Sequence, residues 1–383
     1  MTDPQRRGGA PVGVAALVAL VLVAVSVLMA RSWPGSSGPQ LRSSSGVVGP
    51  SSSSSSASSF PSSPSSWSPS RTSSGLAWAS GAWLGPLPDA ARAADLGSWR
   101  GHPLDLVTTY PEYQTWQQLG STEWTIAVFD GFPGRLSYGL PLLPRQDAGS
   151  LTDVAAGAHD DTWRSIAALL RRHGRGDAEI RIGLEANGDW FPWGIGHQGR
   201  NDPAEFVAAY RRVAQVLRAE LPGARLGFDI GCAHPMAGQR DRLDSLAALY
   251  PGDDVVDVVG CDHYDAGSLV ARDDGSWQRV LRPARAPGLQ DVLDFAVAHH
   301  KRFAVPEWGL TAAAKGGGGD NPEFLTRMNA FFAAHAADVA YENYFNEPDP
   351  YIGCALWQPG GGGRVAGSSP QNPQAAEVYR RLW

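Results

Sequence analysis

Two glutamates of this sequence each follow an apolar segment and precede tryptophans. Glu185 lies in the segment RIGLEANGDWFPWG with Trp190 and Trp193, and Glu307 lies in FAVPEWGL directly before Trp308. A carboxyl group at the end of a buried segment costs free energy unless it is paired or functional. Glycosidic bond cleavage needs two such groups, one to protonate the leaving oxygen and one on the other face of the sugar ring. The two segments therefore predict a sugar-cleaving pair beside aromatic rings that can stack on sugars.

Each glutamate also has a purely structural interpretation. Arg181 precedes Glu185 by four residues, so the two side chains point to the same side of a strand. Arg181 is then either a simple ion-pair partner of Glu185 or a charge that tunes a catalytic carboxylate. Glu307 is alternatively an acid that caps a helix or lies in a loop.

Short apolar segments alternate with amphipathic ones over residues 76–383. The expected strands are Leu76–Leu84, Leu104–Thr109, Thr125–Phe129, Glu179–Leu184, Arg225–Ile230, Val255–Cys261, Arg302–Val305 and either Ala340–Phe345 or Ile352–Trp357. The expected helices are Asp161–His173, Pro203–Leu221, Gly288–His300 and Pro322–Ala337. This alternation favours an α/β fold, the parallel (β/α)8 TIM barrel. The alternative is an open doubly wound sheet, which usually has a Gly-rich loop after its first strand. Gly81–Gly85 matches the G-x-G-x-x-G pattern of that loop poorly.

In a barrel of this kind the functional side chains lie at the C-terminal ends of the strands. The residues at the expected ends are Trp83, Asp130, Glu185, Asp229, Asp262, His263, Tyr264, Glu307 and Trp357. Trp83, Asp130 and Arg181 are candidate substrate-binding residues, as is Asn187, which follows Glu185. Asp262 and His263 fall short of a metal site, because one carboxylate and one imidazole are too few ligands.

The segments LEANGDWFPWG and VPEWGL resemble the two catalytic segments of the β-mannanase-like glycoside hydrolases of family 26. The order of GAWLG, VFDG, the first glutamate, DHY and the second glutamate fits the layout of that family, which belongs to a clan of retaining barrel enzymes. The resemblance covers most of residues 76–383, and its most specific part is the E-x-N-G-x-W-F-x-W-G pattern.

The resemblance implies a role for each matching residue. Glu185 corresponds to the general acid/base, Glu307 to the nucleophile and Tyr264 to the hydroxyl that positions the nucleophile. The residues that correspond to sugar platforms are Trp190, Trp193, Trp308 and Trp357. No metal or organic cofactor is implied. The chain departs from the family at Leu184, where the family usually has histidine and the wider clan has asparagine, and this puts mannan specificity in doubt.

The first 75 residues predict a different organisation. Residues 1–9 contain Arg6 and Arg7, and Ala10–Ala30 carries no charge over 21 residues, long enough to span a membrane. We expect an uncleaved signal anchor with a cytoplasmic N-terminus, the alternative being a cleaved signal peptide and a secreted protein. Residues 31–75 are rich in serine and proline and predict a disordered linker. The expected location is therefore the cell membrane, with the catalytic domain outside.

Composition narrows the function further. A net charge of −6 is not that of a nucleic-acid-binding protein, so we expect no nucleic-acid partner. The expected partner is a polysaccharide or oligosaccharide substrate, and the expected chain is a monomer. Of the three cysteines, Cys232 and Cys261 are either a disulfide of an exported protein or two small buried side chains. The predicted activity is that of an endo-acting retaining β-glycanase on a mannan-like or other surface polysaccharide. The alternative is a non-catalytic carbohydrate-binding or wall-associated barrel.

Overall fold

The computed structural model describes residues 72–146, 149–237, 243–360 and 366–383. Its centre is a closed barrel of eight parallel strands in chain order, each paired with the next and the last with the first. The strands are β1 Ala79–Trp83, β2 Leu106–Thr109, β3 Arg135–Leu140, β4 Glu179–Ile182, β5 Arg225–Gly231, β6 Val258–Tyr264, β7 Arg302–Gly309 and β8 Val339–Phe345. The predicted parallel barrel is confirmed.

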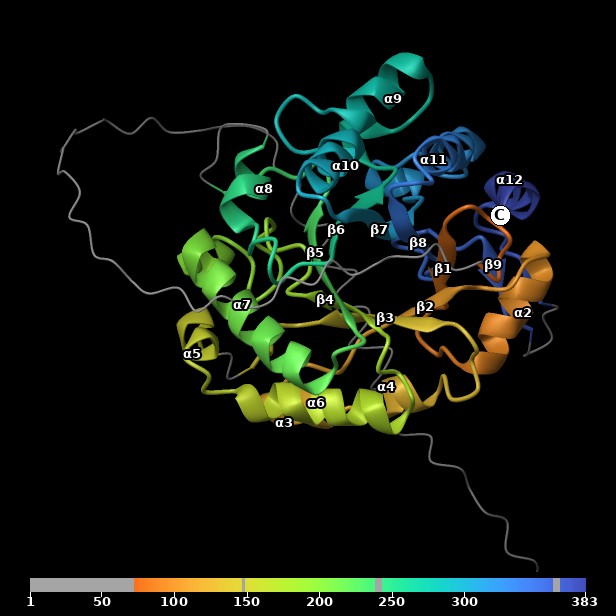
Figure 1. The fold of residues 1–383 in the computed structure, drawn as a ribbon. Helices are drawn as coiled ribbons and strands as arrows, with labels where there is room; N and C mark the ends of the chain where they lie inside the picture. Colours follow the sequence, from red (N-terminus) through yellow and green to blue (C-terminus); the bar gives the residue numbers. More distant parts are fainter. Residues whose placement is uncertain (1–71, 147–148, 238–242, 361–365) are drawn as a thin grey trace, which may run out of the picture.

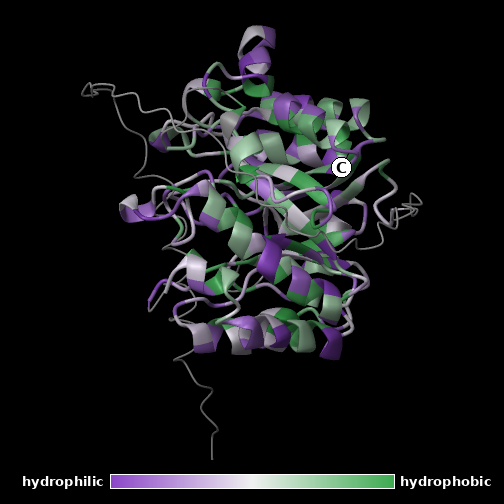
Figure 2. Ribbon diagram, turned by 60° about the vertical axis from the view of Figure 1, so that its left-hand side comes forward, coloured by the Kyte–Doolittle hydropathy of each residue, from purple (hydrophilic) through white to green (hydrophobic). Residues whose placement is uncertain are grey.

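Helices surround the strands (Figure 1). They are α2 Ala90–Arg100, α3 Trp116–Ser121, α4 Trp124–Ala127, α5 Leu151–Ala155, α6 Asp160–Arg172, α7 Pro203–Glu220, α8 Asp244–Leu249, α9 Asp274–Leu281, α10 Leu289–Ala298, α11 Pro322–Ala334 and α12 Pro373–Leu382. Two short strands, β9 Trp357–Gln358 and β10 Gly367–Ser368, form a separate antiparallel pair. The banding of hydrophobic and hydrophilic residues around the helices in Figure 2 is typical of helices with one face against a barrel.

Local sequence explains where the longer helices begin. Asp202 accepts a hydrogen bond from the Glu205 backbone N–H at 3.0 Å, and the Glu205 carboxylate accepts one from the Asp202 N–H at 3.1 Å. This capping box with Pro203 in the first turn fixes the start of α7. Asn321 accepts from the Phe324 N–H ahead of Pro322 and does the same for α11.

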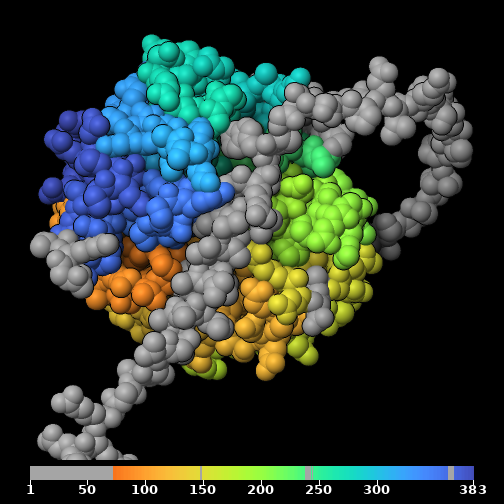
Figure 3. Space-filling model, turned by 180° about the vertical axis from the view of Figure 1, so that it is seen from behind, coloured from red at the N-terminus to blue at the C-terminus, as the bar shows by residue number. Residues whose placement is uncertain are grey.

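The chain follows the barrel around the molecule, so its last segments lie beside its first (Figure 3). Besides the pairing of β8 with β1, α12 packs against α2 through Tyr379, which stacks on Trp99 with ring centroids 6.2 Å apart. Arg380 donates a hydrogen bond to the Trp99 carbonyl at 2.9 Å. These contacts close the outer helical layer as the strand pairing closes the inner one.

One strand prediction was wrong. Thr125–Phe129 has the β-branched and aromatic composition of a strand, yet it forms α4 and the turn after it, with Ile126 and Phe129 buried. The third strand is Arg135–Leu140, which pairs with β2 and β4. A short apolar run does not by itself distinguish a buried strand from a buried helical turn. For the last strand, the first of the two alternatives is confirmed, because β8 spans Val339–Phe345.

The predicted membrane segment Ala10–Ala30 and most of the predicted linker 31–75 lie outside the described residues. Within the part of the chain that the structure describes, no helix combines the length and the apolar character needed to cross a membrane.

Candidate active site

Glu307 lies near the C-terminal end of β7 and is held from several sides. Arg181 donates to its Oε1 at 2.7 Å, Tyr110 donates a short hydrogen bond to the same oxygen, and Tyr264 donates to Oε2 at 2.9 Å. Its backbone N–H donates to Asp262 at 2.9 Å. The side chain is 5% exposed, so these donors rather than water stabilise its negative charge. These hydrogen bonds hold the carboxyl group in one orientation.

Arg181 connects the strands beneath this carboxylate. It lies on β4, is fully buried, and forms ion pairs with Asp229 on β5, Asp262 on β6 and Glu307 on β7. The Arg181–Asp229 contact is bidentate, at 3.2 and 2.8 Å. These partners correct the simple ion-pair interpretation of Glu185, because the ion pairs of Arg181 within the described residues go to the other three carboxylates. One guanidinium thus compensates three carboxylates, which leaves the cluster acidic.

Glu185 follows β4 in a tight turn. Gly183 and Glu185 both have positive φ, +59° and +51°, and a Cβ at Gly183 would lie 2.6 Å from Leu142. The turn directs the Glu185 backbone N–H to Asp229, and the Glu185 Oε2 accepts from Trp190 Nε1 at 2.8 Å. Burial, with Glu307 as the next cause, raises the pKa of Glu185 to about 8. Glu185 is therefore protonated at neutral pH and can donate a proton.

This raised pKa predicts the alkaline side of a pH profile. A general acid works in its protonated form, so kcat/KM on a glycan is expected to fall as pH rises through about 8. The measurement is kcat/KM from about pH 5 to about pH 10. A dinitrophenyl glycoside, whose leaving group needs no proton, serves as control and is expected to lose this alkaline decline. A glycan profile that stays flat to the alkaline end would contradict the assignment of Glu185.

The five tryptophans predicted to bind substrate divide into two that form hydrogen bonds with glutamates and three that lie in the core. Trp190 contacts Glu185 as described, and Trp83 lies at the end of β1 with its Nε1 donating to Glu347 at 3.0 Å. The predicted platforms Trp193, Trp308 and Trp357 are at most 1% exposed. Trp193 stacks on Phe191, and Trp308 packs among aromatic residues that include Trp383. These three predictions are corrected: the rings are core residues, since a ring covered on both faces leaves none for a sugar.

Two of the predicted polar contacts are also corrected. Asp130 does not follow a strand, because the segment before it forms α4 and a turn. Its carboxylate instead forms a hydrogen bond with His173 Nδ1 at 2.8 Å. Asp130 precedes β3 and His173 precedes β4, so both lie at the N-terminal end of the barrel strands, whereas Glu307 lies near the C-terminal end. The Asn187 side-chain amide forms hydrogen bonds with backbone groups. Its Nδ2 donates to the carbonyls of Gly231 and His234, and its Oδ1 accepts from the Gly231 N–H. Asn187 thus ties the loop after β4 to the end of β5.

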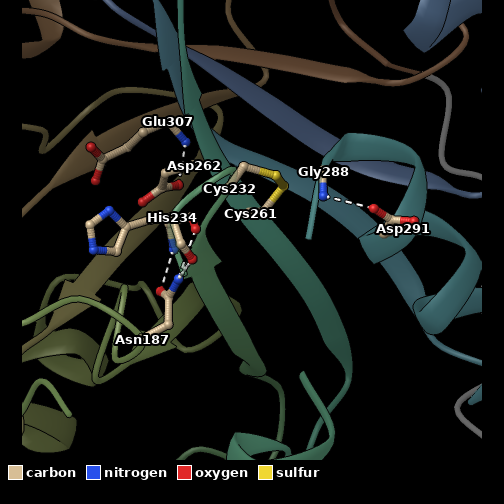
Figure 4. The surroundings of a disulfide bond; sticks show 9 residues. Asn187, Cys232, His234, Cys261, Asp262, Gly288, Asp291 and Glu307 are labelled. Atoms are coloured by element: carbon tan, nitrogen blue, oxygen red, sulfur yellow. Dashed lines mark hydrogen bonds between the residues drawn. A yellow bond between two sulfur atoms is a disulfide. The ribbon is translucent and has the colours of Figure 1, made fainter. Parts of the chain in front are cut away.

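A disulfide joins β6 to the residue that follows β5. Cys232, directly after β5, is bonded to Cys261 on β6, which decides between the two sequence alternatives for this pair (Figure 4). The Cys232 N–H donates to the carbonyl of Asp262 at 2.9 Å, so the bridge lies beside the acidic cluster. His234, two residues on, packs edge-on against Trp190 with centroids 4.5 Å apart. The disulfide therefore stiffens the segment that supports the Trp190–Glu185 contact.

The disulfide predicts a measurable contribution to stability. It closes a loop with a sequence separation of 29, for which the chain-entropy relation gives about 3–4 kcal/mol. Cys232→Ser/Cys261→Ser is expected to lower the thermal midpoint by several degrees, and reductant should lower that of the wild type but not that of the variant. Thiol titration of the denatured, unreduced protein should find only Cys354; three free thiols per chain would contradict the bridge.

The sequence interpretation missed two residues of the candidate site. Tyr110 directly follows β2, so the strand-end rule would have identified it had it been applied to that strand. Glu347 lies two residues beyond β8 and became recognisable only once that strand was chosen between its two alternatives.

The structure thus combines a closed parallel barrel with one buried glutamate after β4 and another on β7. The family model of glycosyl hydrolase family 26 matches residues 180–286 of this chain, from β4 to beyond β6, so the resemblance seen in the sequence is confirmed. Endoglucanase H of Acetivibrio thermocellus is 26% identical over 190 residues, 49% of this chain and 20% of that protein. A mannan endo-1,4-beta-mannosidase of Bifidobacterium adolescentis is 28% identical over 195 residues, 49% of this chain and 18% of that protein. The matches thus span about a fifth of the length of these relatives.

Solved structures support the fold. The catalytic domain of an endo-β-1,4-mannanase from Bacillus sp. JAMB-750 aligns with a TM-score of 0.56 at 16% identity, covering 80% of this chain and 86% of that one. A modular endo-β-1,4-mannanase from Cellulomonas fimi aligns with a TM-score of 0.55 at 19% identity, covering 80% and 70%.

Proposed function

We propose that this barrel is a retaining, endo-acting glycoside hydrolase that cleaves a β-mannan-like polysaccharide. The observation that carries the proposal is the contrast between the two glutamates. Glu185 has a pKa raised to about 8, whereas Glu307 is bound by a guanidinium and two phenol donors. A carboxyl group that keeps its proton at neutral pH can supply the acid, and one held by three donors can supply the nucleophile. The family match and the two glycanase relatives support the same class of reaction.

The first chemical step breaks the glycosidic bond. A carboxylate oxygen of Glu307 forms a bond to the anomeric carbon as the bond from that carbon to the glycosidic oxygen breaks. The Glu185 proton moves to the departing oxygen, which leaves as a hydroxyl group. As Glu307 loses its charge to the new ester, the pKa of Glu185 falls, because repulsion from Glu307 is one cause of its elevation.

The second step returns the enzyme to its starting state. Glu185, now ionised, takes a proton from a water molecule whose oxygen bonds to the anomeric carbon, and the ester bond to Glu307 breaks. The sugar leaves with its original anomeric configuration. Tyr110, Tyr264 and Arg181 again stabilise the carboxylate that is released.

The experiment that tests this function is hydrolysis of β-mannan, glucomannan, xylan and mixed-linkage glucan by the whole chain. We expect reducing ends to appear from a mannan-type polymer together with an early fall in viscosity, which indicates internal cleavage. Glu185→Gln should be strongly impaired on these polymers, and chelator should have no effect. Binding of the polymers without release of sugar would instead support the alternative, a non-catalytic carbohydrate-binding barrel.

We further propose that Ala10–Ala30 anchors a monomeric chain in the cell membrane with the barrel outside. The charge-free length of this segment and the presence of a disulfide in the barrel support the proposal, since disulfides persist in oxidising compartments. Membrane fractionation and protease treatment of intact cells test it. Recovery of a shortened protein in the medium would favour the cleaved signal peptide.

A further inference from the structure

A further buried carboxyl group lies just after the last barrel strand. Glu347 is two residues past the end of β8 and 6% exposed. Its Oε2 accepts a hydrogen bond from Trp83 Nε1 at 3.0 Å, and its Oε1 accepts one from the Asp349 backbone N–H at 3.1 Å. Both of these donors are neutral. A carboxyl group has about four acceptor positions, so its bonds to the described residues leave acceptor capacity unused.

The position of Glu347 is fixed by the residues around it. Asn346 accepts hydrogen bonds from the N–H groups of Leu356 and Trp357, both at 2.9 Å, and donates to the Trp357 carbonyl. On the other side, Pro348 lies against Gly85, where a Cβ would approach it to 3.2 Å. The carboxylate is therefore preorganised rather than carried on a loose loop, which reduces the entropy lost when a ligand binds.

A short series of contacts joins Glu347 to the nucleophile. Trp83, its hydrogen-bond donor, stacks on Phe345 with ring centroids 5.7 Å apart and meets Tyr110 edge-on at 5.6 Å. Tyr110 in turn donates to Glu307. The buried Cys354 thiol has a raised pKa, caused by burial and then by repulsion from Glu347 and Glu307, which places this thiol near both carboxylates. A sugar on Glu307 and a group on Glu347 are thus within one active site.

We propose that Glu347 is a substrate-binding residue that accepts hydrogen bonds from hydroxyl groups of the glycan beside the sugar attacked by Glu307, and so helps to determine which sugar is cleaved. This inference rests on the proposed function. A rigid carboxyl group with unused acceptor positions suits a sugar, whose hydroxyl groups donate hydrogen bonds. A buried acceptor discriminates strongly, because a sugar that presents no donor leaves it unsatisfied.

The test compares Glu347→Gln with Trp83→Phe on mannan and glucan oligosaccharides. The amide keeps the shape of the side chain but its nitrogen cannot accept. We expect KM for the better substrate to rise about tenfold, the loss of one buried hydrogen bond, with kcat within about threefold of wild type. The ratio of kcat/KM between the two sugars should also change. Trp83→Phe removes the indole donor to Glu347 together with part of the ring that packs against Phe345 and Tyr110, and it shows what loss of support for the carboxyl group does while Glu347 itself is kept.

The possible results separate this inference from the proposed function. If the wild type cleaves glycans and Glu347→Gln keeps the wild-type KM and sugar preference, the inference is wrong and the hydrolase stands. Equal kcat losses in Glu347→Gln and Trp83→Phe with unchanged KM would show that Glu347 only supports Trp83, which also overturns it. Absence of glycan cleavage by the wild type would instead overturn the proposed function. Thermal midpoints of both variants are measured alongside.

Discussion

Glu307→Gln is expected to lower kcat by about 10⁴-fold or more, because the amide cannot form the covalent bond to the anomeric carbon. The amide oxygen can still accept from Arg181 and Tyr110, and the amide nitrogen can donate to the Tyr264 hydroxyl, so the thermal midpoint should change little. The matched control is Glu342→Gln, a buried carboxylate on the neighbouring strand that accepts from Trp308 and Trp383. We expect this control to keep its activity, as the side chain contacts only core indoles and Ser80 among its hydrogen-bond partners.

A rescue experiment sharpens the result. Glu307→Ala leaves space where the carboxylate was, so added azide can attack the anomeric carbon from that side while Glu185 still protonates the leaving oxygen. The expected product is a glycosyl azide of inverted configuration. Wild-type kcat in Glu307→Gln would show that another residue is the nucleophile.

Arg181→Met is expected to destabilise the barrel strongly. Arg181 is fully buried and pairs with Asp229, Asp262 and Glu307. Removing one partner of a buried ion pair leaves uncompensated charge and costs about 3–5 kcal/mol. We expect the free energy of unfolding in urea at neutral pH to fall by that amount, with loss of hydrolysis because Glu307 loses a donor.

Arg164→Met is the matched control, since Arg164 is half exposed and its ion pairs to Asp160 and Asp161 lie at the surface. Such pairs contribute about 1 kcal/mol or less. Burial raises the pKa of Asp229 and of Asp262, and loss of the guanidinium raises them further. Protonation then removes the charges that repel, so the deficit of Arg181→Met should shrink as pH falls. A deficit no greater than that of Arg164→Met would contradict the role assigned to the cluster.

The sequence predicts those parts of the fold that follow from local patterns and misses those that depend on tertiary packing. Alternation of apolar strands with capped helices is a local pattern, and it predicts seven of the eight barrel strands, β8 as one of two alternatives. It fails at Thr125–Phe129, where a β-branched run forms a buried helical turn. Only tertiary packing, with Ile126 and Phe129 facing the core, decides that case.

In the candidate site, too, local patterns identify some residues and tertiary packing determines the rest. Glu185 and Glu307 stand out because a carboxyl group after an apolar strand has few structural explanations. Whether Trp308 faces a sugar or the core depends on which side of β7 it occupies, and a register shift between Val305 and Trp308 alters that alternation. The partners of Arg181 come from three further strands, a convergence that spacing along one strand cannot reveal.

The central claim, double displacement by Glu307 with Glu185 as acid and base, is tested most directly by the stereochemistry of the first product. Proton NMR of an oligosaccharide digest within the first minutes distinguishes the anomers before they equilibrate in water. Two displacements at the anomeric carbon predict that the β anomer appears first and the α anomer only later, by mutarotation. Initial appearance of the α anomer would show a single displacement and would contradict the mechanism.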